Sequence, residues 1–213
     1  MQIKKTATSR VTRIILVRHG ETIENKKKIV QGQIHGQLSR LGKTQAKLVG
    51  KRLQKTKIDI IYVSDLGRAR DTAKEIIQHH KNVPVQYDAR IRERSFGIFE
   101  GKNRDIIIAA RKKAEKNYET FTPKNGESFA QLNKRVKSFY HWLLTHEQGK
   151  TVLLVSHGGF ITALLLQLTN SPNSEFKTYH PKNTAITIIE VNGKKSRIHT
   201  LNCTKHLRSK AKG

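Results

Sequence analysis

Two histidines in the sequence follow the same kind of apolar run and stand directly before a glycine. Residues 14–17 lead to His19, and residues 151–155 lead to His157. Imidazole near neutral pH can act as a nucleophile or exchange a proton. Arg18 precedes His19, and its planar guanidinium matches the oxygens of a phosphate group. These residue types therefore indicate chemistry on an anionic ligand.

Buried strands must place these histidines. Each apolar run is typical of a strand that is covered on both faces of a sheet. In an open α/β sheet, ligands bind outside the carboxyl ends of the parallel strands. The two strands would therefore bring both imidazoles to one edge, where Gly20 would let the backbone approach the ligand. A single histidine at the end of a strand is more often a structural residue. The presence of two such histidines favours a functional site.

A third strand end carries another cation. Residues 58–63 form an apolar run, and the sequence after it, SDLGRARDTA at residues 64–73, is typical of a helix start. The positive end of the helix dipole and Arg68 in the first turn both favour an anion. Arg70 is expected to point to solvent.

These motifs together resemble a known family. RHGET at residues 18–22, with Asn25 three positions on, is similar to the signature of the histidine phosphatase (phosphoglycerate mutase-like) superfamily. SHGG at residues 156–159 resembles its second histidine motif, and residues 64–73 resemble its second arginine motif. RERSFG at residues 92–97 resembles the small-phosphatase branch, and the similarity extends from about Arg13 to Leu207.

The resemblance implies a role for each matching residue. His19 would be the nucleophile, Glu93 the proton donor, and His157 a protonated or donating group that stabilises charge on the transferring phosphoryl. Glu100 keeps a structural role. The implied catalytic residues are Arg18, His19, Arg68, Glu93 and His157. The implied phosphate-binding residues are Arg18, Gly20, Asn25, Gln31, Gly32, Arg68, Glu93, His157 and Gly158. No metal ligand set and no cofactor are expected.

The expected fold is a three-layer α/β/α sandwich with a mostly parallel central sheet and a small helical cap. Helices are expected after Ser39 and over residues 103–118, 128–146 and 159–168. A short edge strand is expected at 83–85, and strands at 184–191 and 196–203 would form a hairpin around Asn192-Gly193. Residues 1–213 would form one domain, with flexible basic ends at 1–12 and 208–213.

Composition adds broader expectations. The net charge of +26 would attract polyanions, or it reflects lysines spread over a solvated surface, and the spread along the chain favours the second interpretation. Cys203 is the single cysteine and no apolar run reaches the roughly 18 residues of a membrane span, so a cytoplasmic protein is expected. Either six basic residues line the cap over a polyanionic substrate or most of them face water: Lys102, Arg104, Arg111, Lys112, Lys113 and Lys116.

The leading functional hypothesis is a metal-independent phosphomonoesterase that acts through a phosphohistidine on a small phosphorylated metabolite. One alternative is a primer-dependent phosphoglycerate mutase, which usually has a longer insertion before the second histidine. An alternative of another class is a basic nucleic-acid-binding protein on the same scaffold, although aromatic residues make up only 6% of the chain. Oligomeric state does not follow from the sequence.

Overall fold

The computed structural model describes residues 11–208, so most of the two expected flexible ends, residues 1–10 and 209–213, lie outside the described part. The expected boundary at residue 12 is wrong. Thr12 is the first residue of strand β1 (Thr12–Arg18) and is 2% exposed. Its hydroxyl accepts the N–H of Gly149 at 3.0 Å, which ties the start of β1 to the loop before β4.

A six-stranded sheet forms the centre of the molecule, in the order β3-β2-β4-β1-β5-β6. Besides β1, its strands are β2 (Ile60–Val63), β3 (Val85–Tyr87), β4 (Thr151–Ser156), β5 (Ile186–Asn192) and β6 (Lys195–Cys203). Neighbours β3, β2, β4 and β1 are parallel, whereas β5 runs antiparallel to β1 and to β6. The turn at Gly193, with φ 59°, closes the expected hairpin.

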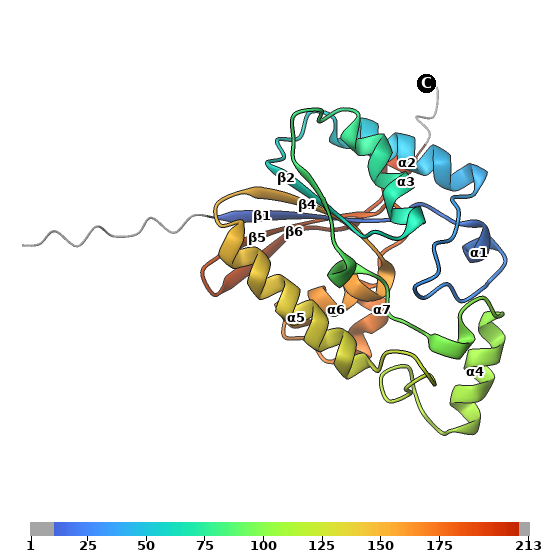
Figure 1. The fold of residues 1–213 in the computed structure, drawn as a ribbon. Helices are drawn as coiled ribbons and strands as arrows, with labels where there is room; N and C mark the ends of the chain where they lie inside the picture. The colour runs from blue at the N-terminus through green and yellow to red at the C-terminus, as the bar shows by residue number, and fades with distance from the viewer. Residues whose placement is uncertain (1–10, 209–213) are drawn as a thin grey trace, which may run out of the picture.

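Helices cover both faces of the sheet and so produce the expected three layers (Figure 1). They are α1 (Ile23–Lys26), α2 (Arg40–Leu53), α3 (Gly67–Ile77), α4 (Arg104–Lys113), α5 (Phe129–His146), α6 (Gly158–Leu168) and α7 (Phe176–Tyr179). Helices α2 and α3 lie on one face, and α5, α6 and α7 lie on the other. Helix α4 stands beyond the end of the sheet, within a cap segment defined as residues 102–127. No helix among residues 11–208 combines the length and apolar composition that a membrane crossing needs.

The alternation of side chains along β1 builds two cores. Ile14 and Leu16 pack with α5 and α6, whereas Ile15 and Val17 pack with α2 and α3. All four are fully buried. Each such side chain contributes about 1.5–3 kcal/mol on burial, so β1 is fixed from both sides. The residues that follow it therefore have a rigid support.

The ends of two elements differ from the expectation. Helix α4 ends at Lys113 and does not reach residue 118, because Glu115 has a φ of 53° and the Asn117 side chain accepts the N–H of Thr120 at 3.0 Å. Strand β3 begins after Pro84, which has no N–H to donate, and it lies at the sheet edge as expected.

Candidate active site

The register of the two central strands brings the histidines together. Strand β1 pairs with β4 in parallel, with Arg18 opposite Ser156, so the next residues are His19 and His157. Their ring centroids are 5.2 Å apart, and the side chains are 2% and 0% exposed. The backbone N–H of His19 donates to the carbonyl of Ser156 at 3.0 Å. Two segments far apart in the sequence thus form one imidazole pair.

The hydrogen bonds of His19 define its tautomer. Nδ1 lies 2.7 Å from the carbonyl oxygen of Gly20, which can only accept, so Nδ1 carries the proton. Nε2 is then the nitrogen with the lone pair, and it accepts from Nε of Arg68 at 3.3 Å. Burial, followed by the charges of Arg68 and Arg18, holds the pKa of His19 well below 6.5. At neutral pH the ring is therefore uncharged, with the lone pair on Nε2.

His157 lies behind His19 and does not line the cavity that opens there. Its Nε2 is 2.7 Å from Oγ of Ser64, and its Nδ1 is buried without a hydrogen-bond partner among the described residues. Burial, followed by the charge of Arg68, holds the pKa of His157 well below 6.5. Of the two states left open by the sequence, the structure favours the neutral ring that donates one hydrogen bond.

Arg68 is the second residue of α3, as the sequence predicts, and it is 1% exposed. Its Nη2 donates to the carbonyl of Gly32 at 2.8 Å, and Nη1 donates to that of Ile34 at 2.6 Å. Burial lowers the pKa of Arg68 to about 10, while Glu93 opposes that change. The loop that contains Gly32 therefore holds a buried cation against His19.

Arg18 has a partner that no sequence motif indicates. Its Nη1 donates to the carbonyl of Pro181 at 2.7 Å and lies 3.5 Å from Nε2 of His180. The His180 ring stacks on Phe176, with 5.3 Å between centroids. Nothing in the sequence singles out His180 except its place just before residues 181–184, which resemble the phosphatase branch. Desolvation lowers the pKa of Arg18, which still has a buried, unpartnered Nε among the described residues.

Glu93 is held at the first turn of α6. Its Oε1 accepts the N–H of Arg94 at 2.8 Å and that of Gly159 at 3.0 Å, and its Oε2 lies 3.1 Å from the same Gly159 nitrogen. Arg92 points away and pairs with Asp65, with 2.7 Å between Nε and Oδ1. The acid thus comes to the edge of the sheet where His157 precedes α6.

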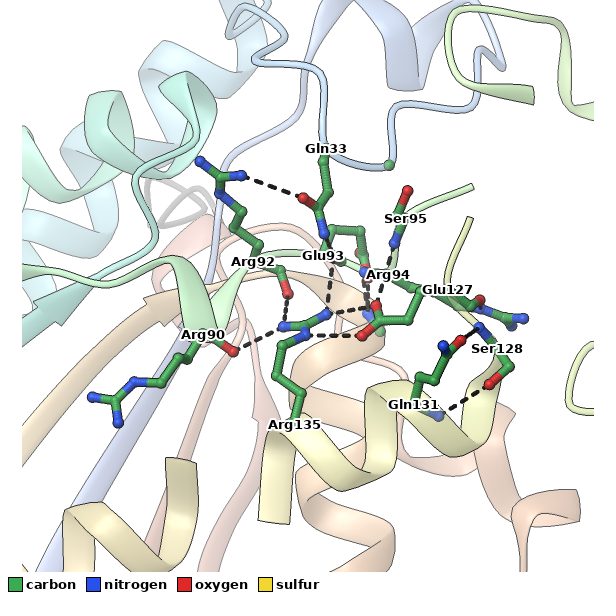
Figure 2. Close-up of polar contacts among 12 residues, drawn as sticks. Gln33, Arg90, Arg92, Glu93, Arg94, Ser95, Glu127, Ser128, Gln131 and Arg135 are labelled. Carbon is green, nitrogen blue, oxygen red and sulfur yellow. Dashed lines mark hydrogen bonds and ion pairs between the residues drawn. The ribbon is translucent and has the colours of Figure 1, made fainter. Parts of the chain in front are cut away.

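A half-buried network fixes the backbone around Glu93 (Figure 2). Arg135 of α5 donates to the carbonyls of Arg90 at 2.8 Å and Arg92 at 2.9 Å. Its other face forms a two-bond pair with Glu127, at 2.9 and 2.7 Å. Arg135 lies on α5 next to the buried Val136, and no sequence motif indicates it. It therefore acts as an unforeseen positioning residue for the segment that carries Glu93.

Arg94 ties the cap to the same segment. It is 1% exposed, and its three nitrogens donate to the carbonyls of Glu127 at 2.8 Å, Tyr118 at 2.9 Å and Phe121 at 2.6 Å. These bonds satisfy a buried cation with neutral acceptors. Its charge is therefore directed to the cap backbone and not to a carboxylate.

A cavity of about 220 Å³ lies between this edge of the sheet and the cap. Seven of the residues implied by the resemblance line it: Arg18, His19, Asn25, Gln31, Gly32, Arg68 and Glu93. His157, Gly20 and Gly158 do not. The structure therefore brings the imidazole of His19, the guanidiniums of Arg18 and Arg68 and the carboxyl group of Glu93 to a common space.

Nearly the whole amino-acid sequence matches the model of one protein family. Residues 14–204 match the model of the histidine phosphatase superfamily, branch 1. The chain belongs to this family. It is therefore a hydrolase of phosphomonoesters, of the histidine phosphatase type.

Individual relatives agree with this assignment. A probable phosphatase of Schizosaccharomyces pombe is 32% identical over 210 residues, which cover 94% of this chain and 98% of that protein. The metal-independent phosphoserine phosphatase of Arabidopsis thaliana is 33% identical over 178 residues, which cover 78% and 72%. The solved structure of Bacillus stearothermophilus YhfR superposes with a TM-score of 0.85 at 29% identity, covering 92% and 100%. The expected fold is confirmed.

Two glycines of this histidine phosphatase differ from the expected role. A Cβ on Gly20 would come within 2.7 Å of the carbonyl oxygen of Gly42, so Gly20 lets α2 approach β1 closely. This packing gives Gly20 a structural reason of its own, and Gly20 does not line the cavity. A Cβ on Gly158 would meet the ring of His180, so Gly158 serves the packing around Arg18. Gly32 does face the cavity, with a φ of 50°.

The uncharged candidates lie on the wall formed by residues 25–32. Asn25 accepts the N–H of Thr22 with Oδ1 at 3.2 Å, which leaves its amide nitrogen as a donor. Gln31 is 8% exposed, and its Oε1 is buried without a partner among the described residues. Glu100 accepts the N–H of Phe96 at 2.8 Å and that of Gln33 at 3.1 Å, which is the structural role expected for it.

The six basic residues near the cap divide into two groups. Arg104 and Arg111 line the cavity, whereas the lysines at 102, 112, 113 and 116 are exposed and do not. Within residues 11–208, no three His, Cys, Asp or Glu side chains are grouped so that they could hold a metal ion. The basic surface and the basic site are therefore separate features.

Proposed function

We propose that the protein is a metal-independent phosphomonoesterase that hydrolyses a small phosphorylated metabolite through a phosphohistidine on His19. One observation carries the proposal. The unprotonated Nε2 of His19 shares a single cavity with two guanidiniums and a carboxyl group. Phosphoryl transfer requires a positioned nucleophile, cations around the equatorial oxygens and a proton for the leaving oxygen.

The first step forms the covalent intermediate. The lone pair on Nε2 of His19 attacks phosphorus, and the bond from phosphorus to the ester oxygen breaks. Glu93, in its protonated form, gives its proton to that oxygen and leaves as a carboxylate. Arg68 releases its bond to Nε2 and, with Arg18, binds the phosphoryl oxygens. Throughout this step the Gly20 carbonyl accepts a hydrogen bond from Nδ1–H of His19 and so stabilises the positively charged ring.

The second step releases phosphate. A water molecule attacks phosphorus through its oxygen while Glu93 accepts one of its protons. The bond from phosphorus to Nε2 of His19 breaks at the same time. In both steps the Nδ1–H of His157 donates a hydrogen bond to a phosphoryl oxygen and keeps its proton, which suits a neutral ring with an unpartnered Nδ1. Asn25 and Gln31 supply uncharged contacts to the same group. Gly158 enters only through packing, whereas Gly20 also contributes its carbonyl.

The size of the cavity supports a small substrate. Its volume of about 220 Å³ is below the roughly 300–1,000 Å³ of sites for drug-sized ligands. The Arabidopsis relative is named for an amino acid phosphate, a molecule of that size class. The exposed lysines of the cap lie outside the cavity, so the alternative of a nucleic-acid-binding protein gains no support from the lining of this site.

The direct test uses His19→Ala with p-nitrophenyl phosphate in EDTA. Hydrolysis by the wild type should persist in EDTA and fall to background in the variant. His79→Ala, which replaces an exposed histidine, is the matched control and should keep wild-type activity. Acid-labile phosphate should be trapped on His19 of the wild type.

Two results would overturn the proposal. Hydrolysis at the wild-type rate by His19→Ala would exclude the nucleophile. A phosphoglycerate mutase activity that needs a bisphosphoglycerate primer and exceeds hydrolysis would assign the site to the mutase alternative.

A further inference from the structure

The side chains that line the cavity carry more positive charge than one phosphate group requires. The described lining contains five guanidiniums, of Arg18, Arg68, Arg94, Arg104 and Arg111, and one carboxylate, of Glu93. Arg18 and Arg68 stand beside His19, where the transferring phosphoryl group binds. Arg94 is satisfied by three backbone carbonyls. The guanidiniums of Arg104 and Arg111 have neither of these two roles.

These two arginines have no anionic partner within the described residues. Neither forms an ion pair with a carboxylate among residues 11–208, and neither guanidinium donates a hydrogen bond there. Nε of Arg111 is buried and unpartnered, although Arg111 lines an open cavity. Burying a guanidinium donor without an acceptor is costly, and an anionic ligand would remove that cost.

Helix α4 presents both arginines on the face that covers the cavity. They are seven residues apart, which is two helical turns and about 10.5 Å along the axis. Ile107, one turn from each, is the buried residue of this helix and also lines the cavity. The N–H of Arg104 donates to the carbonyl of Lys28 at 2.8 Å, which fixes the start of α4 to the wall that contains Asn25.

Apolar side chains separate the two charged ends of the cavity. Ile107, Phe96 and Phe121 lie in its lining. A carbon skeleton would pack against them while one anionic group meets Arg18 and Arg68 and a second meets the α4 arginines. A neutral alcohol would leave Arg104 and Arg111 unpaired beside it.

We propose that Arg104 and Arg111 bind a second anionic group, a carboxylate or a phosphate, on the alcohol part of the substrate. This inference rests on the proposed phosphatase function and narrows its substrate class to phosphomonoesters with two anionic ends. Guanidinium forks bind either anion through two parallel hydrogen bonds.

The test compares three esters with one carbon skeleton: propyl phosphate, 3-(phosphonooxy)propanoate and propane-1,3-diyl bisphosphate. Phosphate release gives kcat/KM for each. The wild type should prefer at least one of the two esters with a second anionic group over propyl phosphate by about tenfold or more, and the preferred ester identifies a carboxylate or a phosphate. Arg111→Gln and Arg104→Gln should each reduce that preference about 10- to 100-fold.

Two variants make the comparison sharper. Lys112→Gln removes an exposed charge next to Arg111 on the same helix and should keep the wild-type preference. Arg111→Lys keeps the charge but not the fork, and should restore part of the preference, which a purely structural role would not predict. Circular dichroism shows that each variant is folded.

The outcomes separate the two proposals. A wild type that hydrolyses all three esters with equal kcat/KM, or an Arg111→Gln variant with an unchanged preference, overturns the second anion site and leaves the phosphatase intact. A wild type that hydrolyses none of them, or a His19→Ala variant that hydrolyses them as well as the wild type does, overturns the phosphatase proposal itself.

Discussion

Ser64 Oγ lies 2.7 Å from Nε2 of His157, at the point where β2 ends beside β4. The N–H of Leu66 donates to the same hydroxyl oxygen at 3.4 Å, and Nε2 of His157 is the acceptor that the described residues offer to the hydroxyl proton. In a neutral imidazole one nitrogen accepts and the other donates. Ser64 therefore places the His157 proton on Nδ1, the nitrogen without a protein partner.

Replacing this hydroxyl should change the tautomer. Ser64→Ala is expected to lower kcat about 10- to 100-fold with a smaller change in KM, because a charge-stabilising donor is lost. The ¹⁵N shifts of His157 should show mixed protonation of the two nitrogens, and Ser64→Thr should recover part of the rate. Wild-type ¹⁵N shifts in Ser64→Ala would contradict this role.

Glu93→Gln separates the two chemical steps. Without the acid, kcat for an alkyl phosphate should fall about 10²- to 10⁴-fold, since the leaving oxygen needs a proton. p-Nitrophenolate is a weakly basic leaving group, so its release should survive as a burst of one equivalent, followed by slow hydrolysis. Rapid-mixing absorbance measures the burst. If the burst and the later hydrolysis slowed by the same factor, Glu93 would not be the acid that protonates the leaving oxygen.

Gly159→Ala tests the position of the Glu93 carboxyl group without replacing Glu93 itself. A Cβ at residue 159 would meet Oε1 of Glu93 and push the carboxylate off the first turn of α6. We expect kcat to fall about 100-fold, because small displacements of a catalytic group are costly. Gly67→Ala is the matched control, since its Cβ would make an ordinary 3.4 Å contact with the carbonyl of Gly36.

The buried histidines predict a pH dependence of stability. Both His19 and His157 have pKa values well below 6.5, first because of burial and then because of nearby arginines. Below about pH 6.5 the unfolded chain binds protons that the folded chain does not, so the free energy of unfolding falls as the pH drops. Urea midpoints at pH 7.5 and 5.5 measure the loss, and His19→Asn should reduce it.

The ring signals provide an independent check. In the folded protein, the ¹⁵N resonances of His19 and His157 should show no titration between pH 8 and 6.5. A midpoint near 6.5 for either ring would contradict the lowered pKa.

Sequence patterns predict the residues on the central strands well. Runs such as residues 14–17 have only one stable placement, between two layers of helices, so the convergence of His19 and His157 follows from strand order. Ser39 and Ser128 begin helices where expected, because a hydroxyl there accepts the N–H of the third helical residue.

Long-range polar contacts cannot be predicted in this way. Arg135 and Arg94 have no pattern that distinguishes them from surface arginines, yet both hold the backbone around Glu93 by bonds to carbonyls far along the chain. The end of α4 at Lys113 depends on the turn around Asn117, which competes with helix geometry locally. The role of Gly20 depends on Gly42, a contact between two elements.

The pairing of Arg18 with Ser156 across β1 and β4 places the residues proposed to break the bond at the ends of two buried strands, whereas the α4 arginines stand on the peripheral cap segment. Mutations in the cap segment can therefore redirect selectivity while the reactive centre stays intact. New substrates are accessible to this scaffold by exchange of a single short segment, without redesign of its catalytic apparatus.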